Sequence, residues 1–141
     1  MSISVRVANP IAYTGPTMPF DSPLNIERTT GAEPGTVILR LTGTLTLAAI
    51  LELRSHLRDV EPPQLMIIDL TGVPYVDSAG MSEIVNHEIY CREKQVRMIV
   101  TGANRRVFDM LKTTHLDKIL TLKSTVEKAE ANQGPSATPD F

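Results

Sequence analysis

Residues 66–81 read Met66-Ile67-Ile68-Asp69-Leu70-Thr71-Gly72-Val73-Pro74-Tyr75-Val76-Asp77-Ser78-Ala79-Gly80-Met81. An apolar run stops at a Thr-Gly and Pro turn, and a helical pattern begins at Asp77 and Ser78. This order predicts a buried strand, a turn and a helix. The hydroxyl of Ser78 then lies at the positive end of the helix, where the helix dipole and free backbone N–H groups stabilise a phosphate. The stretch therefore marks Ser78 as a candidate switch.

On both sides of this stretch, strand and helix signals alternate along the chain. Strands are predicted at 24–29 and 36–42, which form a hairpin, and at 65–70, 96–101 and 119–122. Helices are predicted through 47–57, 78–94 and 107–111 and after Ser124. Strands that alternate with helices imply right-handed crossovers and a sheet covered by helices. The sequence predicts an α/β domain with a small, mixed, mostly parallel sheet of about four to five strands and about four helices.

Helical spacing also predicts which side chains face the core. In the first helix these are Leu47, Ile50, Leu51 and Leu57. In the second helix they are Met81, Ile84, Val85 and Ile89. Ser124 and Glu127 have the spacing of a capping box, which predicts that the last helix has Ser124 as its N-cap.

The two ends of the chain differ in composition from the part between them. Residues 1–23 hold four prolines and predict an extended or disordered arm, although Ile3–Val7 alternates and could pair as an edge strand. Residues 132–141 predict a disordered tail by the same reasoning. One domain is therefore expected over 24–131.

Overall composition excludes several classes of function. The chain has 141 residues and a net charge of −2, with no basic stripe of the kind that binds nucleic acid. No apolar run is long enough to span a membrane, and the N-terminus lacks the apolar core of a signal peptide. The single cysteine, Cys91, excludes an internal disulfide and fits a reducing compartment. We therefore expect a cytoplasmic protein.

Two enzyme-like patterns were weighed against simpler interpretations. Val76-Asp77-Ser78-Ala79-Gly80 is similar to a nucleophile elbow, but Val76 stands where that turn needs a small residue. Asp69 ends a buried strand, as a phospho-acceptor aspartate does, but the first long strand ends Leu41-Thr42-Gly43-Thr44 and offers no acidic pair for Mg²⁺. Asp69 is therefore expected to be a turn or loop-capping residue, and the protein is not expected to be an enzyme.

Two further patterns have a plain and a functional interpretation. Glu83, His87 and Cys91 lie four residues apart, as metal ligands can, but isolated spacings of this kind are common. We expect a mixed polar flank with a half-buried thiol there, and no metal or cofactor. Ser78 itself fits an ordinary helix N-cap, since Ser and Asp are preferred at that position.

Five segments taken in order resemble the STAS domain, and most closely the anti-sigma factor antagonists. They are Ile38–Leu45, Asp69–Val73, Tyr75–Met81, Arg106–Leu111 and His115–Ile119. Tyr75-Val76-Asp77-Ser78-Ala79-Gly80-Met81 looks like the D-S-S-G-L-G motif of that family. The resemblance covers about three quarters of the chain, and the order of the motifs is more specific than any one of them.

The resemblance implies a phosphorylation switch at Ser78. In the family, an anti-sigma factor that is also a Ser/Thr kinase phosphorylates this serine. The unphosphorylated form binds the kinase and frees the sigma factor, and a phosphatase restores it. Asp77 would orient the hydroxyl or the loop. This chain departs from the pattern in having Ala79 for the second serine, Ser82 for the last glycine, and Thr46 where many members carry an acidic residue.

The resemblance also implies a docking surface for the kinase around Ser78. The residues expected to form it are Thr44, Thr46, Asp77, Gly80, Met81, Ser82 and Glu83. Met81 is the expected apolar anchor, unless it points into the core. Expected partners also include a serine phosphatase and, as a weak homodimer, a second copy of the chain. The alternative function is a STAS module in a stress-signalling scaffold or lipid-transport complex, with the arm 1–23 as a docking segment.

Overall fold

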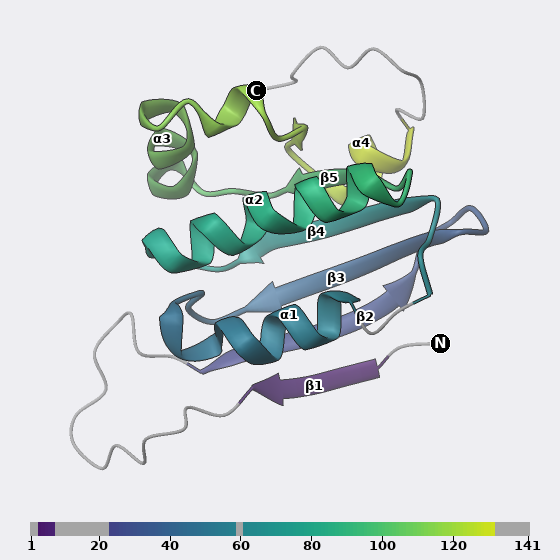
Figure 1. The fold of residues 1–141 in the computed structure, drawn as a ribbon, viewed down its shortest axis with the longest axis horizontal. Helices are drawn as coiled ribbons and strands as arrows, with labels where there is room; N and C mark the ends of the chain where they lie inside the picture. Colours follow the sequence, from purple (N-terminus) through teal and green to yellow (C-terminus); the bar gives the residue numbers. More distant parts are fainter. Residues whose placement is uncertain (1–2, 8–22, 59–60, 132–141) are drawn as a thin grey trace.

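Six strands form one sheet in the order β1-β2-β3-β4-β5-β6 in the computed structural model, which describes residues 3–7, 23–58 and 61–131 (Figure 1). The strands are β1 Ile3–Val7, β2 Leu24–Thr30, β3 Thr36–Thr42, β4 Leu65–Gly72, β5 Arg97–Thr101 and β6 Leu122–Lys123. The helices are α1 Ile50–Arg58, α2 Ser78–Glu93, α3 Arg105–Thr113 and α4 Val126–Ala131, with 3₁₀ turns η1 Leu47–Ala49 and η2 Leu116–Lys118.

The sheet is mixed, as predicted. β1 pairs with β2 and β2 with β3 in antiparallel register, which confirms the hairpin. The pairs β3–β4, β4–β5 and β5–β6 are parallel, and α1, α2 and α3 make the crossovers between them. Ile3–Val7 does form an edge strand, which brings the sheet to six strands. Apart from this strand and Pro23, the predicted arm 1–23 lies outside the described residues, as does the predicted tail 132–141.

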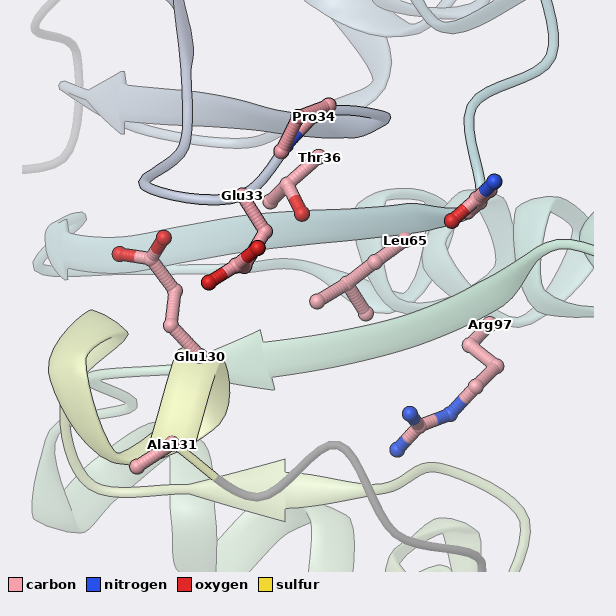
Figure 2. A pocket seen from close by; sticks show the side chains of 8 residues that line it. Glu33, Pro34, Thr36, Leu65, Arg97, Glu130 and Ala131 are labelled. Carbon is pink, nitrogen blue, oxygen red and sulfur yellow. The ribbon is translucent and has the colours of Figure 1, made fainter.

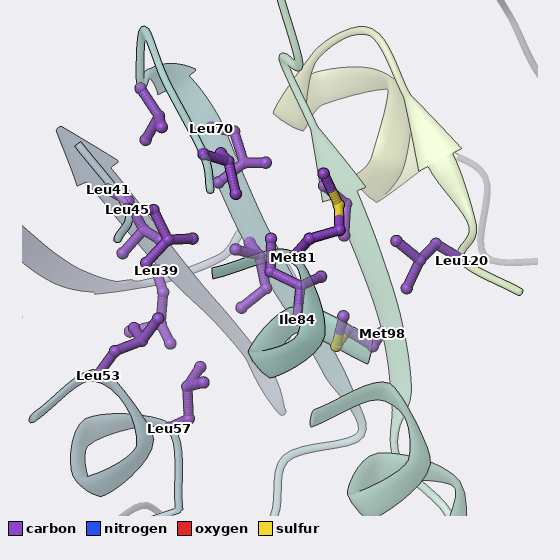
Figure 3. Close-up of a cluster of buried hydrophobic side chains, with 14 of the residues drawn as sticks. Leu39, Leu41, Leu45, Leu53, Leu57, Leu70, Met81, Ile84, Met98 and Leu120 are labelled. Atoms are coloured by element: carbon purple, nitrogen blue, oxygen red, sulfur yellow. The ribbon is translucent and has the colours of Figure 1, made fainter. Parts of the chain in front are cut away.

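Helices pack on both faces of the sheet. The larger core cluster joins one face to α1, α2 and α3 and includes Ile68 and Val107. Leu39 and Met81, which belong to the same cluster, are labelled in Figure 3. The smaller cluster joins the other face to α4; its members are Ile38, Leu65, Ile67, Ile99, Val126 and Ala129. Because β4 is covered on both faces, every residue from Leu65 to Leu70 is buried, which explains its almost unbroken apolar run.

The core-facing side of α1 differs from the prediction. Ile50 and Leu57 are buried as expected, and Leu53 joins them. Leu47 and Leu51, however, are 72% and 75% exposed. The spacing 50, 53 and 57 defines the inward face, and the 3₁₀ turn of η1 places Leu47 outside it.

The core-facing side of α2 also differs from the prediction. Met81 and Ile84 are buried as expected, whereas Ile89 is 48% exposed and Val85 is half-buried. The other buried residues of the helix are Gly80, Glu83, His87, Glu88 and Cys91. A second flank of α2 is covered because α1 packs beside it, and that flank is polar.

The C-terminal elements begin later than predicted. The turns around η2 occupy Leu116 to Leu120, so the last strand starts at Leu122 instead of Ile119. The predicted Ser124 cap is wrong by one residue. The Thr125 hydroxyl accepts the backbone N–H of Lys128 at 3.1 Å, and α4 begins at Val126.

Candidate functional site

Ser78 is the first residue of α2, a helix of 16 residues, and its side chain is exposed. The N-cap is Asp77, whose Oδ1 accepts the backbone N–H of Gly80 at 2.8 Å. The plain interpretation of Ser78 as the N-cap is therefore wrong. Because Asp77 caps α2, the Ser78 hydroxyl lies at the exposed, positive end of the helix and is not needed as the cap.

Two loops meet at this end of the sheet and hold Asp77 in place. The backbone N–H of Leu45 donates to the Tyr75 carbonyl at 3.0 Å, and that of Asp77 donates to the Leu45 carbonyl at 3.1 Å. Leu45 and Val76 form a parallel bridge between these bonds, and both side chains are buried. The loops after β3 and β4 thus extend the sheet by one more pair of residues before the helices begin.

Asp77 makes a second bond from the same carboxylate. Its Oδ2 accepts the backbone N–H of Leu47 at 3.0 Å, where η1 begins. One side chain therefore caps α2 and fixes the start of the segment that leads into α1. The hydrogen bonds from Asp77 to the backbone N–H groups of Leu47 and Gly80 therefore fix where Ser78 lies relative to this segment.

Gly80 is the point of closest approach between α2 and the loop after β3. A Cβ added to Gly80 would lie 2.4 Å from the Leu45 carbonyl oxygen and 3.0 Å from Val76 Cγ1. Backbone oxygen cannot move away as a flexible side chain can. The glycine of the motif is thus required by packing in this chain.

The residues predicted to form a docking surface are divided between surface and interior. Ser82 is exposed like Ser78, and Thr46 and Asp77 are half-buried. Thr44, Gly80, Met81 and Glu83 are all buried, so their side chains do not form the surface; for Met81 this is the alternative in which it points into the core. Met81 is 4% exposed and lies in the core, so it cannot be an apolar anchor on the surface (Figure 3).

Glu83 is buried because it has a partner on α1. Its Oε1 accepts hydrogen bonds from two guanidinium nitrogens of Arg54, at 2.8 and 3.1 Å. The Glu83 side chain is 1% exposed, whereas that of Arg54 is 40% exposed. The pair ties α1 to α2 one and a half turns below Ser78 and leaves part of the guanidinium at the surface.

His87 and Cys91 continue the buried polar flank of α2. His87 Nε2 lies 3.5 Å from Cys91 Sγ. Burial, with Arg58 nearby, lowers the pKa of His87 to about 4, so the ring is neutral at pH 7. Burial and the nearby Glu88 raise the pKa of Cys91 to about 12, which keeps it an unreactive thiol. Within the described residues, no three His, Cys, Asp or Glu side chains could hold a metal ion.

Asp69 is an internal clamp and not part of the Ser78 site. Its Oδ1 accepts the backbone N–H and hydroxyl of Thr71, at 3.1 and 2.6 Å, and the Thr101 hydroxyl at 3.2 Å. Its Oδ2 lies 3.5 Å from Arg40 Nε. Asp69 and Thr71 both lie within β4, so in place of the expected turn or loop-capping role Asp69 ties β4 to β3 and β5.

A hollow of about 590 Å³ lies at the opposite end of the strands from Ser78, where β3, β4 and β5 begin (Figure 2). Glu33, Arg97 and Glu130 are among the residues that line it. Glu130 also accepts the backbone N–H of Ala32, which links α4 to the β2–β3 turn. Ser78 follows the other end of β4, so the hollow is separate from the serine site.

Sequence reasoning missed the most exposed apolar side chains beside the site, Leu47 and Leu51. The signal was present, since Ile50, Leu53 and Leu57 alone satisfy an inward face and leave Leu51 outside it. None of the helices in the described ranges is long and apolar enough to cross a membrane.

Comparison with known proteins places this fold. The STAS domain family matches residues 25–129. Among solved structures, an anti-sigma factor antagonist from Mycobacterium paratuberculosis is 20% identical with a TM-score of 0.64, over 75% of this chain and 92% of that one. A sulfate transporter family protein from Wolinella succinogenes is also 20% identical, with a TM-score of 0.65 over 73% and 86%.

The Bacillus cell fate determinant SpoIIAA in its phosphorylated form is 16% identical, with a TM-score of 0.60 over 75% of this chain and 96% of that one. At these identities the likeness to the solved structures is one of fold. The family match covers most of the chain, from β2 to α4. The chain belongs to the STAS domain family.

Proposed function

We propose that this protein is an anti-sigma factor antagonist that works in the cytoplasm without catalysing a reaction. Its unphosphorylated form binds a kinase-type anti-sigma factor, and the sigma factor held by that kinase is released. Phosphorylation of Ser78 switches it off until a phosphatase restores it. The observation that carries the proposal is the exposed Ser78 hydroxyl at the start of α2, beside an aspartate that already provides the cap.

A phosphate on Ser78 is compatible with the fold. It adds about −1.5 to −2 charges at a helix N-terminus, where negative charge is favourable by roughly 0.3–1 kcal/mol. Asp77 opposes this with like charge, although both its oxygens accept backbone N–H groups. The two effects are small and of opposite sign. The phosphate should therefore act at the binding surface, where a desolvated or repelled charge costs several kcal/mol of affinity.

Two solved structures give this proposal its context. SpoIIAA has been solved in both an unphosphorylated and a phosphorylated form, and both share the fold of this chain. The anti-sigma factor antagonist from Mycobacterium paratuberculosis shares this fold as well.

The experiment that tests the function is release of sigma factor from a purified complex with its kinase-type anti-sigma factor. Wild type and Ser78→Ala should release sigma factor, and Ser78→Asp should not. Thr113→Asp, which adds the same charge on the exposed end of α3, should behave like wild type. Equal release by Ser78→Asp and wild type would contradict the switch, and no binding by wild type would contradict the function.

The second candidate function is a STAS module in a larger assembly, such as a scaffold or a transport complex. The likeness of fold to a sulfate transporter family protein favours it. In that case the protein should co-purify with its partners whatever the state of Ser78. Equal co-purification of Ser78→Asp and wild type would favour this second function over the first.

A further inference from the structure

One outward stripe of α1 carries both apolar and basic side chains beside Ser78. Its members are Leu51, Arg54 and Arg58, whose spacing by three and four residues places them on one face of α1, and Leu47, which precedes them in η1. We call them the α1 stripe. Leu47 and Leu51 are the two most exposed large apolar side chains of the described residues, at 72% and 75%. The Leu47 backbone N–H is bonded to Asp77, and Leu51 follows four residues later.

The other end of the stripe is basic. Arg58 Cζ lies 5.0 Å from the centre of the Tyr90 ring, and Lys94 Nζ lies 5.8 Å from it. Two cations therefore gather on one aromatic ring where α1 and α2 end. The Arg54 guanidinium is 40% exposed but is paired with Glu83, so the net positive charge at this end comes from Arg58 and Lys94. The net charge of the whole chain is −2, so this end of the stripe has the opposite sign to the chain as a whole.

We propose that the α1 stripe docks an acidic amphipathic helix of the partner protein. Apolar side chains of that helix would cover Leu47 and Leu51, and its carboxylates would face Arg58 and Lys94. Apolar positions at helical spacing are what a helix presents to such a face. The opposite charges orient the helix along the stripe.

The inference rests on the proposed function in one respect, because it names the surface used by the kinase-type anti-sigma factor. It also gives the phosphate a physical effect. Ser78 lies within roughly 10 Å of the Leu47 backbone, through Asp77, which is about one Debye length at 0.1 M salt. A phosphate there would lie at the apolar end of the stripe, where docking would remove it from water, so its desolvation disfavours docking.

The test uses the full chain labelled with ¹⁵N and two synthetic helical peptides as probes. Both peptides have leucines on one face; one has glutamates on its flanks and the other has lysines. The glutamate peptide should shift the amide signals of 47–58 and Tyr90 and bind at least about tenfold more tightly than the lysine peptide. Leu47→Ser/Leu51→Ser should reduce its affinity about tenfold or more, and Arg58→Glu, which sets a carboxylate beside Lys94, should remove the preference.

The matched control is Ile119→Ser, since Ile119 is an exposed apolar residue outside the stripe, and it should bind the glutamate peptide like wild type. Equal binding of both peptides, or shifts confined to other residues, would overturn the proposal. Signals of 47–58 that move with protein concentration alone would assign the stripe to a second copy, and would also overturn it. Thermal unfolding checks that each variant is folded.

A second arm uses the purified kinase-type anti-sigma factor. If it binds wild type and Leu47→Ser/Leu51→Ser equally, the α1 stripe fails while the proposed function stands. If it does not bind wild type at all, the proposed function fails and the peptide titration still decides the stripe.

Discussion

The Asp77 carboxylate accepts the Leu47 backbone N–H at 3.0 Å while it also caps α2 through Gly80. This relationship couples the serine site to the exposed face of α1. A change in the position of Asp77 at the start of α2 therefore also changes the backbone at Leu47, where the segment that leads into α1 begins.

Asp77→Asn should separate the two bonds. Asparagine has one acceptor oxygen and is a good N-cap, so it keeps the bond to Gly80 and turns an N–H₂ group toward Leu47. We expect a loss of about 1 kcal/mol of unfolding free energy and faster hydrogen exchange at the Leu47 amide. Asp77→Ala should lose about 2 kcal/mol and expose both amides. Unchanged hydrogen exchange at the Leu47 amide in both variants would contradict the bond between Leu47 and the Asp77 side chain.

Gly80→Ala should destabilise the protein although alanine favours helices. The helix propensity of alanine gains about 1 kcal/mol, but the added Cβ meets the Leu45 carbonyl oxygen at 2.4 Å, and overpacking costs about 1–3 kcal/mol. We expect a net loss of about 1 kcal/mol in urea unfolding. Ser82→Ala, on the exposed side of the same turn, is the control and should not destabilise. A Gly80→Ala variant as stable as wild type would show that α2 and the loop after β3 can move apart without a loss of unfolding free energy.

Arg54→Met should leave the buried Glu83 carboxylate without its partner. Because the guanidinium is 40% exposed, we expect a loss of about 1–3 kcal/mol, less than for a fully buried pair. The double variant Arg54→Met/Glu83→Leu should recover most of this loss, since the orphan charge is gone. Chemical denaturation of the four proteins in this cycle measures the coupling. Additive effects of the two substitutions would mean that the pair does not interact.

Stability should fall as the pH drops through the range in which unfolded His87 is protonated and folded His87 is not. Its pKa is lowered from 6.5 to about 4 by burial, so the unfolded state binds the proton first. The free energy of unfolding that depends on His87 is therefore highest above pH 6.5 and is about 3 kcal/mol lower at pH 4.

The pKa of Glu88 is raised by burial, which opposes this trend near the lower end. The difference between wild type and His87→Gln isolates the histidine. The unfolding free energy of His87→Gln should vary less between pH 7 and 4 than that of wild type. Identical pH dependence in wild type and His87→Gln would contradict the lowered pKa.

The strand, turn and helix around Ser78 could be predicted because their signals are local. The apolar run of β4, the Gly72–Pro74 turn and the helical pattern after Asp77 lie within twenty residues. The N-cap could not be assigned, because Asp77 and Ser78 are equally good caps and the choice depends on the loop that Leu45 brings alongside.

Only part of the surface around the site could be predicted, because the rest depends on which residues of neighbouring helices meet. Glu83 is inside because Arg54 reaches it from α1, and Leu51 is outside because Ile50 and Leu53 already fill the inward face. The burial of Glu83 joins residues from two helices, whereas the exposure of Leu51 follows from the inward face of α1 alone. Periodicity within one helix carries no information about a partner on the next.

Intact mass after incubation with ATP and the purified kinase-type anti-sigma factor tests the central claim most directly. Wild type and Ser82→Ala should each gain the mass of one phosphoryl group, and Ser78→Ala should gain none. Ser82 is the matched control because it is the other exposed serine in the first turns of α2. An equal gain in Ser78→Ala and wild type would contradict Ser78 as the acceptor, and no gain in any of the three would contradict the switch.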